Sequence, residues 1–86
     1  MQIAYALNFL RMFKSLPPEL QNEAYEKIEL FRDPANQARL KVHKLRGRLS
    51  GRYSFSVNYS VRIVFRYMNS PKEALLLAIG SHDVYR

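Results

Sequence analysis

The chain has 86 residues, no cysteine and a formal net charge of +7. This length allows a single domain, residues 1–86, with one modest core, and the lack of cysteine excludes a disulfide framework or a thiolate metal site. The longest apolar run, residues 74–79, is too short to span a bilayer, and the N-terminus has no signal-peptide pattern, so we expect a soluble, cytoplasmic protein with no membrane partner.

Motifs for metal or cofactor binding are not found in the sequence. It has two histidines without a carboxylate cluster, no Walker-type phosphate loop and no dinucleotide glycine motif. We therefore expect neither a metal nor a cofactor.

The positive charge lies almost entirely in the second half of the chain. Residues 1–38 contain four Lys and Arg against five Asp and Glu, whereas residues 39–86 contain ten against two. Such a basic half favours a polyanion as partner, because neutralised phosphates release counterions and contribute affinity without sequence recognition. An acidic protein is the alternative partner, and charge alone does not distinguish the two.

The first half predicts a strand followed by a helical hairpin. Residues 1–7 are apolar and nearly alternating, which fits a strand or the start of a helix; we favour a strand, with Asn8 capping the following helix. The Pro17–Pro18 pair ends that helix and suits the first turn of a second helix, residues 18–32. Apolar stripes mark both helices: Phe9, Leu10, Phe13 and Leu16 in the first, and Leu20, Ala24, Ile28 and Phe31 in the second. We expect both to pack on the sheet and assign them no chemical role.

Residues 39–52 form a basic segment that contains no acid. Gly47 and Gly51 permit turns within it. Its cations are Arg39, Lys41, Lys44, Arg46, Arg48 and Arg52. They fit either a surface loop or a rim that binds nucleic acid, and we favour the rim because crowding so many uncompensated cations is costly. His43, judged from this segment alone, is a surface histidine.

Residues 53–67 alternate between apolar and polar positions, as do two half-buried strands of a hairpin. A two-residue loop would pair apolar with polar positions, whereas a loop of three or five residues keeps the apolar set on one face. That set is Phe55, Val57, Ile63 and Phe65; the other face carries Ser54, Ser56, Asn58, Arg62, Val64 and Arg66. Hydroxyls beside guanidinium groups could cradle a phosphate, but the hairpin alone favours an ordinary solvated face.

Residues 74–79 predict a third strand of the meander, apolar enough to lie centrally with both faces partly covered. Gly80 ends this strand. His82 and Tyr85 should therefore stand at its end, beside the open face of the hairpin.

These segments, in this order, resemble the RelE/ParE superfamily of bacterial toxins from type II toxin–antitoxin modules. The resemblance covers almost the whole chain and is carried by its strand, its helical hairpin and three motifs. These are His-Lys-Leu-Arg-Gly at 43–47, Tyr-Ser-Phe-Ser-Val at 53–57 with Arg-Ile-Val-Phe at 62–65, and Gly-Ser-His-Asp-Val-Tyr at 80–85. The implied fold is α+β, with an N-terminal strand and a two-helix hairpin on one face of a mainly antiparallel four-stranded sheet.

The resemblance also implies a function. Many members are ribosome-dependent endonucleases that cleave translated mRNA, with the ribosome, the mRNA and a cognate antitoxin bearing an acidic segment as partners. The alternatives are a ParE-like inhibitor of DNA gyrase without nuclease activity, or a degenerate homologue that only binds an antitoxin.

By resemblance, four residues have catalytic roles. Arg62 contacts the scissile phosphate, His82 is the general acid, Tyr85 stacks or acts on the substrate, and His43 matches a histidine of one nuclease branch. RNA-binding roles are predicted for Lys41, Lys44, Arg46, Arg48, Arg52, Ser54, Ser56 and Arg66. The two serines replace lysines or a histidine of the nuclease branches, and Ser60 replaces a carboxylate, so the general base is left open.

Overall fold

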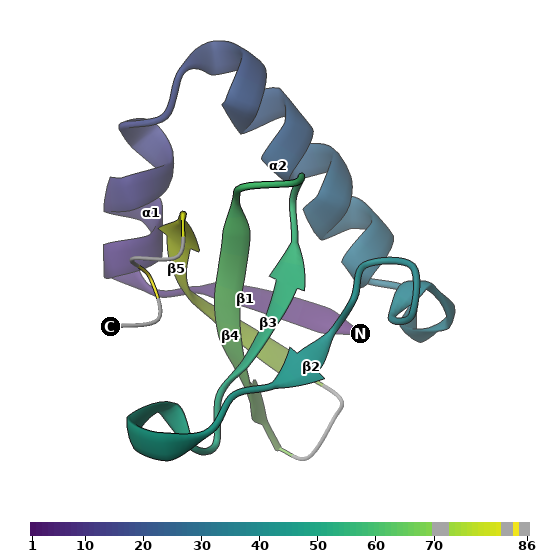
Figure 1. Cartoon of the computed structure of the whole chain (residues 1–86). Coiled ribbons are helices and arrows are strands. Elements are labelled where there is room, and N and C mark those ends of the chain that lie inside the picture. Colours follow the sequence, from purple (N-terminus) through teal and green to yellow (C-terminus); the bar gives the residue numbers. More distant parts are fainter. Residues whose placement is uncertain (70–72, 82–83, 85–86) are drawn as a thin grey trace.

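The computed structural model describes residues 1–69, 73–81 and 84. These residues form an α+β fold in which two helices stand as an inverted V over a twisted five-stranded sheet (Figure 1). The elements are β1 (Gln2–Tyr5), α1 (Leu7–Lys14), α2 (Pro18–Phe31), β2 (His43–Lys44), β3 (Tyr53–Ser56), β4 (Arg62–Met68) and β5 (Glu73–Gly80), with 3₁₀ turns at Pro34–Asn36 and Gly47–Leu49. None of the described helices has the length and apolar character needed to cross a membrane.

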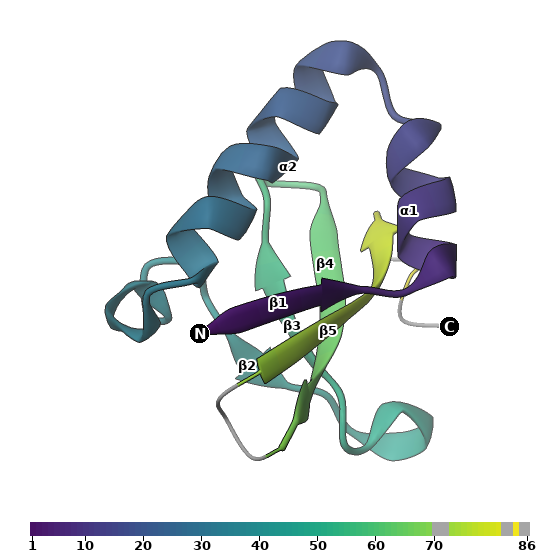
Figure 2. The same cartoon turned by 180° about the vertical axis from the view of Figure 1, so that it is seen from behind.

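The strand order in the described residues is β1-β5-β4-β3-β2. β1 is parallel to β5 and lies beside it in Figure 2, and the other neighbours are antiparallel. The predicted fold class is confirmed, but the sheet has five strands and not four. The additional strand is β2, whose two residues pair with β3; two residues are too few to show the alternation of a strand. Gly47 and Gly51, with φ of +69° and +88°, turn the flanking backbone as predicted.

The start of α1 differs from the prediction. The helix begins at Leu7, and the N-cap is Ala6, which has no side-chain capping bond, so the predicted Asn8 cap is wrong. Asn8 lies inside the helix, and its side-chain amide donates to the carbonyl oxygen of Leu77 at 3.3 Å. The amide therefore ties α1 to β5, one of the central strands.

The hairpin of β3 and β4 has the predicted register and loop length. Phe55 pairs with Ile63, and a five-residue turn, 57–61, joins the strands. The predicted apolar face is buried, and Phe31 of α2 covers it with ring centroids 4.4 Å from Phe55 and 4.7 Å from Phe65. α2 thus covers one face of the hairpin, while the opposite face meets a helix only at the β5 side, where Asn8 of α1 borders a hollow with Val64.

A β-bulge between β4 and β5 sets which residues of β5 enter the core. Val64 pairs with Ala78, but Phe65 pairs with Leu76, so Leu77 is an extra residue. The buried positions of β5 are Ala74, Leu76 and Ile79. Their spacing of two and then three residues follows from the bulge, which keeps all three on the helix-covered face.

Candidate functional site

Arg62 starts β4 on the sheet face opposite the helices. It pairs with Ser56, and its Nη1 donates to the carbonyl oxygens of Asn58 at 2.7 Å and Val61 at 3.2 Å. In the described part of the chain its Nε and Nη2 groups have no hydrogen-bond acceptor. The predicted orientation of Arg62 toward Ser56 and Asn58 is confirmed, and the guanidinium is fixed at one nitrogen while its other donors can meet an anion.

His43 lies at the start of β2 with its ring against β3. Its Nδ1 is 3.0 Å from the carbonyl oxygen of Lys41, and its Nε2 is 3.3 Å from Oγ of Ser54. Because a carbonyl oxygen only accepts, Nδ1 carries a hydrogen, and in the neutral ring Nε2 accepts from the Ser54 hydroxyl. The residue is exposed, and Nε2 is the ring nitrogen that carries the lone pair in this tautomer.

The two serines of β3 differ in accessibility. Ser54 is fully buried, so the prediction that it stands on an open face is wrong. It is covered because β2, the strand not predicted from the sequence, brings the ring of His43 against it. Ser56 is half-buried and borders the space beside Arg62. Val64, which was predicted on the same open face, is also buried, at 1% exposure, and it borders a hollow with Val84. This face is therefore accessible near Ser56 and Arg62 but not at Ser54 or Val64.

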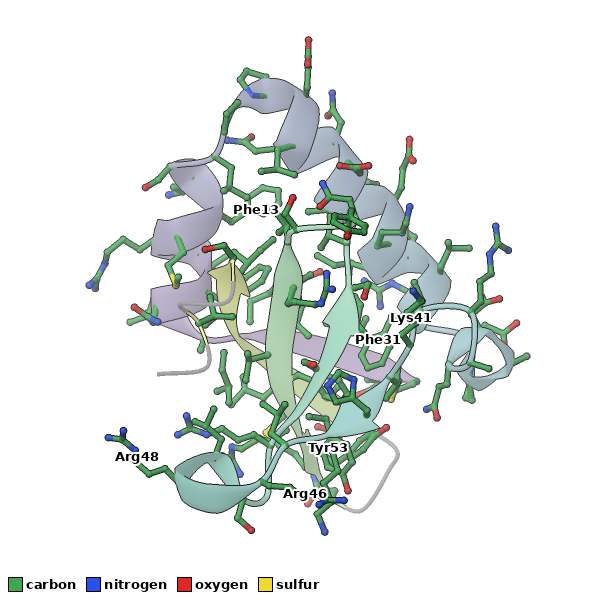
Figure 3. All side chains as sticks on the ribbon, in the orientation of Figure 1. Phe13, Phe31, Lys41, Arg46, Arg48 and Tyr53 are labelled. Carbon is green, nitrogen blue, oxygen red and sulfur yellow. The ribbon has the colours of Figure 1, made fainter. Side chains whose placement is uncertain are left out.

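The predicted RNA-binding cations are spread along the molecule. Figure 3 shows Lys41 near the end of α2, and Arg46 and Arg48 at the far end of the basic segment. Three further exposed cations of the predicted set are Lys44, Arg52 and Arg66. Among the described residues none of these six cations forms a salt bridge. Their charges are thus available to a long anionic partner more than to a single small ligand.

His82 and Tyr85 lie outside the described residues, so their predicted roles remain predictions. Val84, which stands between them in the sequence, lies against Gly80: a Cβ added at Gly80 would come within 2.8 Å of Cγ1 of Val84. Val84 also borders a hollow of about 300 Å³ together with Val64 of β4. Since Val64 shares a face with Arg62, Val84 packs on the same face of the sheet as Arg62.

A pocket of about 480 Å³ lies beside Arg62, and several of its residues were not predicted as site residues. Lys27 comes from α2, Arg39 from the start of the basic segment, and Tyr59 from the turn between β3 and β4. Lys27 is thus a helix residue that lines this pocket. The described residues contain no group of three His, Cys, Asp or Glu that could hold a metal ion.

Comparisons with known proteins agree on the fold. No family model and no curated protein matches the sequence. YafQ from E. coli strain BL21(DE3) superposes with a TM-score of 0.78 at 16% identity, over 96% of this chain and 94% of that chain. The toxin–antitoxin complex RelBE2 from Mycobacterium tuberculosis contains a chain that matches with a TM-score of 0.76 at 20% identity, over 94% of this chain and 90% of that chain. For the YoeB/ParE toxin from Agrobacterium tumefaciens the TM-score is 0.69 at 16% identity, over 95% of this chain and 99% of that chain.

These likenesses extend over nearly the whole of each chain. At identities of 16–20% they establish a common architecture. The chain therefore has the RelE/ParE fold, the fold of toxins from toxin–antitoxin modules.

Proposed function

We propose that the chain is the toxin of a type II toxin–antitoxin module and acts as a ribosome-dependent endonuclease on translated mRNA. The fold and the basic second half support this proposal. The observation that carries it is Arg62, which is fixed by two backbone carbonyls and lines a cationic pocket between α2, the start of the basic segment and the turn between β3 and β4. A guanidinium held in advance at this position can stabilise the charge that develops on a phosphorane, without reorganising during the reaction.

Cleavage of RNA by its own 2′-hydroxyl requires three catalytic contributions from the protein. The hydroxyl must lose its proton as its oxygen attacks phosphorus, the phosphorane charge must be stabilised, and the leaving 5′-oxygen must be protonated. Arg62 stabilises the phosphorane charge. His82 protonates the leaving 5′-oxygen, because a histidine can donate a proton near neutral pH. Tyr85 stacks on a base of the substrate.

His43 is the proposed base. Its Nδ1–H bond to Lys41 leaves the lone pair of the neutral ring on Nε2, and this atom exchanges its 3.3 Å contact with the Ser54 hydroxyl for the substrate hydroxyl. The Nδ1 bond to the carbonyl oxygen of Lys41 keeps the ring oriented during this exchange. The cations of the basic segment bind phosphates on either side of the cleaved bond.

The proposed protein partner is a cognate antitoxin with an acidic segment that neutralises the basic segment, residues 39–52. A second surface suited to an antitoxin is the apolar groove between α1 and α2, about 180 Å³ in volume. Leu7, Leu10 and Tyr25 are exposed apolar side chains of these two helices. Contact with both surfaces at once would cover the cations and the apolar residues together.

One observation favours the second candidate, a ParE-like inhibitor of DNA gyrase. The strand β3 provides Ser54 and Ser56 where the nuclease branches have lysines or a histidine, and Ser54 is buried. The strand therefore supplies no charged catalytic group. His82 and His43 favour the nuclease, because a pure binding protein needs no proton donor or acceptor at these places.

Expression in bacteria without an antitoxin is expected to arrest growth and to produce cuts within translated mRNA. His82→Ala should lower the cleavage rate roughly a hundred- to ten-thousand-fold, because it removes the general acid. Primer extension on a translated transcript measures the cuts made by the wild type and by His82→Ala. The matched control is Ser81→Ala, a change at the exposed neighbour of His82. Intact transcripts together with blocked DNA replication would contradict the nuclease and point to gyrase.

Gly80→Ala is expected to weaken cleavage with little change in the melting temperature. The new Cβ would come within 2.8 Å of Cγ1 of Val84, so Val84 must move, and it stands between His82 and Tyr85 in the sequence. The double variant Gly80→Ala/Val84→Ala lacks the clashing atom and should recover part of the activity. Equal activity of Gly80→Ala and the wild type in the primer-extension assay would show that this contact does not position the C-terminal residues.

A further inference from the structure

The pocket beside Arg62 is cationic and has no acidic residue in its lining. Three segments far apart in the sequence build it: α2, the start of the basic segment and the turn between β3 and β4. Its cations are Lys27, Arg39, Lys41 and Arg62. Among the described residues none of the four forms a salt bridge. Four uncompensated cations around about 480 Å³ create a strong local attraction for an anion.

Tyr59 stands on the rim of this pocket with 96% of its surface exposed. Its backbone is held by Asn58, whose Oδ1 accepts from the N–H groups of Ser60 and Val61, both at 2.9 Å. The Nδ2 of Asn58 donates to Glu23 of α2 at 2.7 Å, which engages the nearby carboxylate and anchors the turn to the helix. A fully exposed aromatic ring on an anchored turn presents a flat face for stacking at little cost in backbone entropy.

Lys41 has a left-handed backbone, with φ of +58°. Such a conformation is unfavourable for any residue with a side chain and is readily adopted by glycine. Two hydrogen bonds hold it: the N–H of Lys41 donates to Ala38 at 3.1 Å, and its carbonyl accepts from Nδ1 of His43 at 3.0 Å. Strained residues gather at functional sites, and here the strain places an ammonium group on the wall of the pocket.

We infer that this pocket binds a second nucleotide of a single-stranded RNA, one that flanks the nucleotide at the cleaved bond. The phosphate lies among Arg39, Lys41 and Lys27, and the base stacks on Tyr59. Arg62 lines the pocket and also serves the cleavage site, so it connects the two. The inference rests on the proposed function for the choice of RNA as substrate. It assigns binding of the flanking nucleotide to Lys27, Arg39, Lys41 and Tyr59, which have no role in the cleavage step.

The test is binding of an all-2′-deoxy pentanucleotide, which cannot be cleaved by a 2′-hydroxyl, to the full chain at about 50 mM salt. Amide NMR signals of Lys41, Asn58 and Tyr59 should shift on titration, and Tyr59→Ala should weaken binding roughly 5- to 150-fold, the range measured for loss of one stacked base. Tyr25→Ala is the matched control, since Tyr25 is an exposed tyrosine outside this pocket, 58% exposed. It should bind like the wild type.

Two cation variants test the phosphate. Arg39→Gln and Lys41→Gln should each lower the slope of log affinity against log salt by about 0.7, the value for one phosphate contact on a single strand, whereas Lys14→Gln on α1 should not. Lys41→Gly should weaken binding like Lys41→Gln yet raise the melting temperature, because glycine adopts a positive φ without strain.

The outcomes separate this inference from the proposed function. If the pentanucleotide binds at this pocket but the chain cleaves no mRNA, the binding pocket is supported and the nuclease function is rejected. The inference is overturned if the pentanucleotide does not bind, or if Tyr59→Ala binds as tightly as Tyr25→Ala. It is also overturned if the NMR shifts avoid residues 39–41 and 56–59.

Discussion

Arg62→Ala is expected to lower the cleavage rate roughly a hundred- to a thousandfold, the loss typical of a preorganised group that stabilises transition-state charge. The same change removes the two hydrogen bonds from Nη1 to Asn58 and Val61. Because the side chain is half-buried, their loss should also cost about 1–2 kcal/mol of stability. Cleavage of ribosome-bound mRNA and urea unfolding of the same preparations measure the two effects.

Two controls separate the chemistry of Arg62 from its structural bonds. Arg66→Ala removes an exposed arginine from the same strand and face, so it should weaken binding slightly and leave the cleavage step and stability unchanged. Arg62→Lys keeps the charge but not the forked donors, and it should restore only part of the activity. Full activity of folded Arg62→Ala would rule out the cleavage site described here.

Phe55→Ala is expected to have the largest effect on stability, about 3–5 kcal/mol. Phe55 is fully buried, stacks on Phe31 at 4.4 Å and lies 5.8 Å from Phe65. The cavity opens between α2 and the hairpin, where neither side can collapse without losing the register of the sheet. Since the free energy of unfolding of native proteins is only about 5–15 kcal/mol, this loss should leave much of the variant protein unfolded at 37 °C.

Thermal and urea unfolding check this expectation, with a fall in Tm of roughly 12–40 °C for a domain of this size. Tyr59→Ala is the control, since it removes an aromatic ring that is 96% exposed and should leave Tm nearly unchanged. A loss below 1 kcal/mol for Phe55→Ala would contradict the assignment of the core.

The hairpin could be predicted from the sequence because its alternation depends on parity. Phe55, Val57, Ile63 and Phe65 share a face only if the paired residues have an even sum, and the observed pairs, such as Phe55 with Ile63, obey this. The proline pair likewise located the break between the helices. Local patterns of this kind specify elements and registers, and the order of the elements pointed to the fold.

Features that depend on contacts between distant segments could not be predicted in this way. The apolar run 74–79 hides the bulge at Leu77, since every residue in it suits either face. The burial of Ser54 depends on β2, which is only two residues long. Asn is a residue type typical of helix N-caps, but the side-chain amide of Asn8 donates to the carbonyl oxygen of Leu77 in β5 instead.

The candidate site was predictable in part. Arg62 points where the register placed it, and the cations of the basic segment are exposed. Lys27 and Tyr59 were not predicted, because nothing in their own segments shows that α2 and the β3–β4 turn meet Arg39. The available signals were the uncompensated cations of the basic segment and a tyrosine at a turn, where an aromatic side chain has little to pack against.

The most direct test of the proposed function is cleavage of a defined mRNA by the purified chain, with and without purified ribosomes bound to the mRNA. The expected result is cutting of the ribosome-bound mRNA, loss of cutting with Arg62→Ala and His82→Ala, and retained cutting with Ser81→Ala. DNA gyrase supercoiling should be unaffected by the same preparation. Uncut mRNA under both conditions, together with inhibited supercoiling, would contradict the nuclease and establish the chain as a gyrase inhibitor.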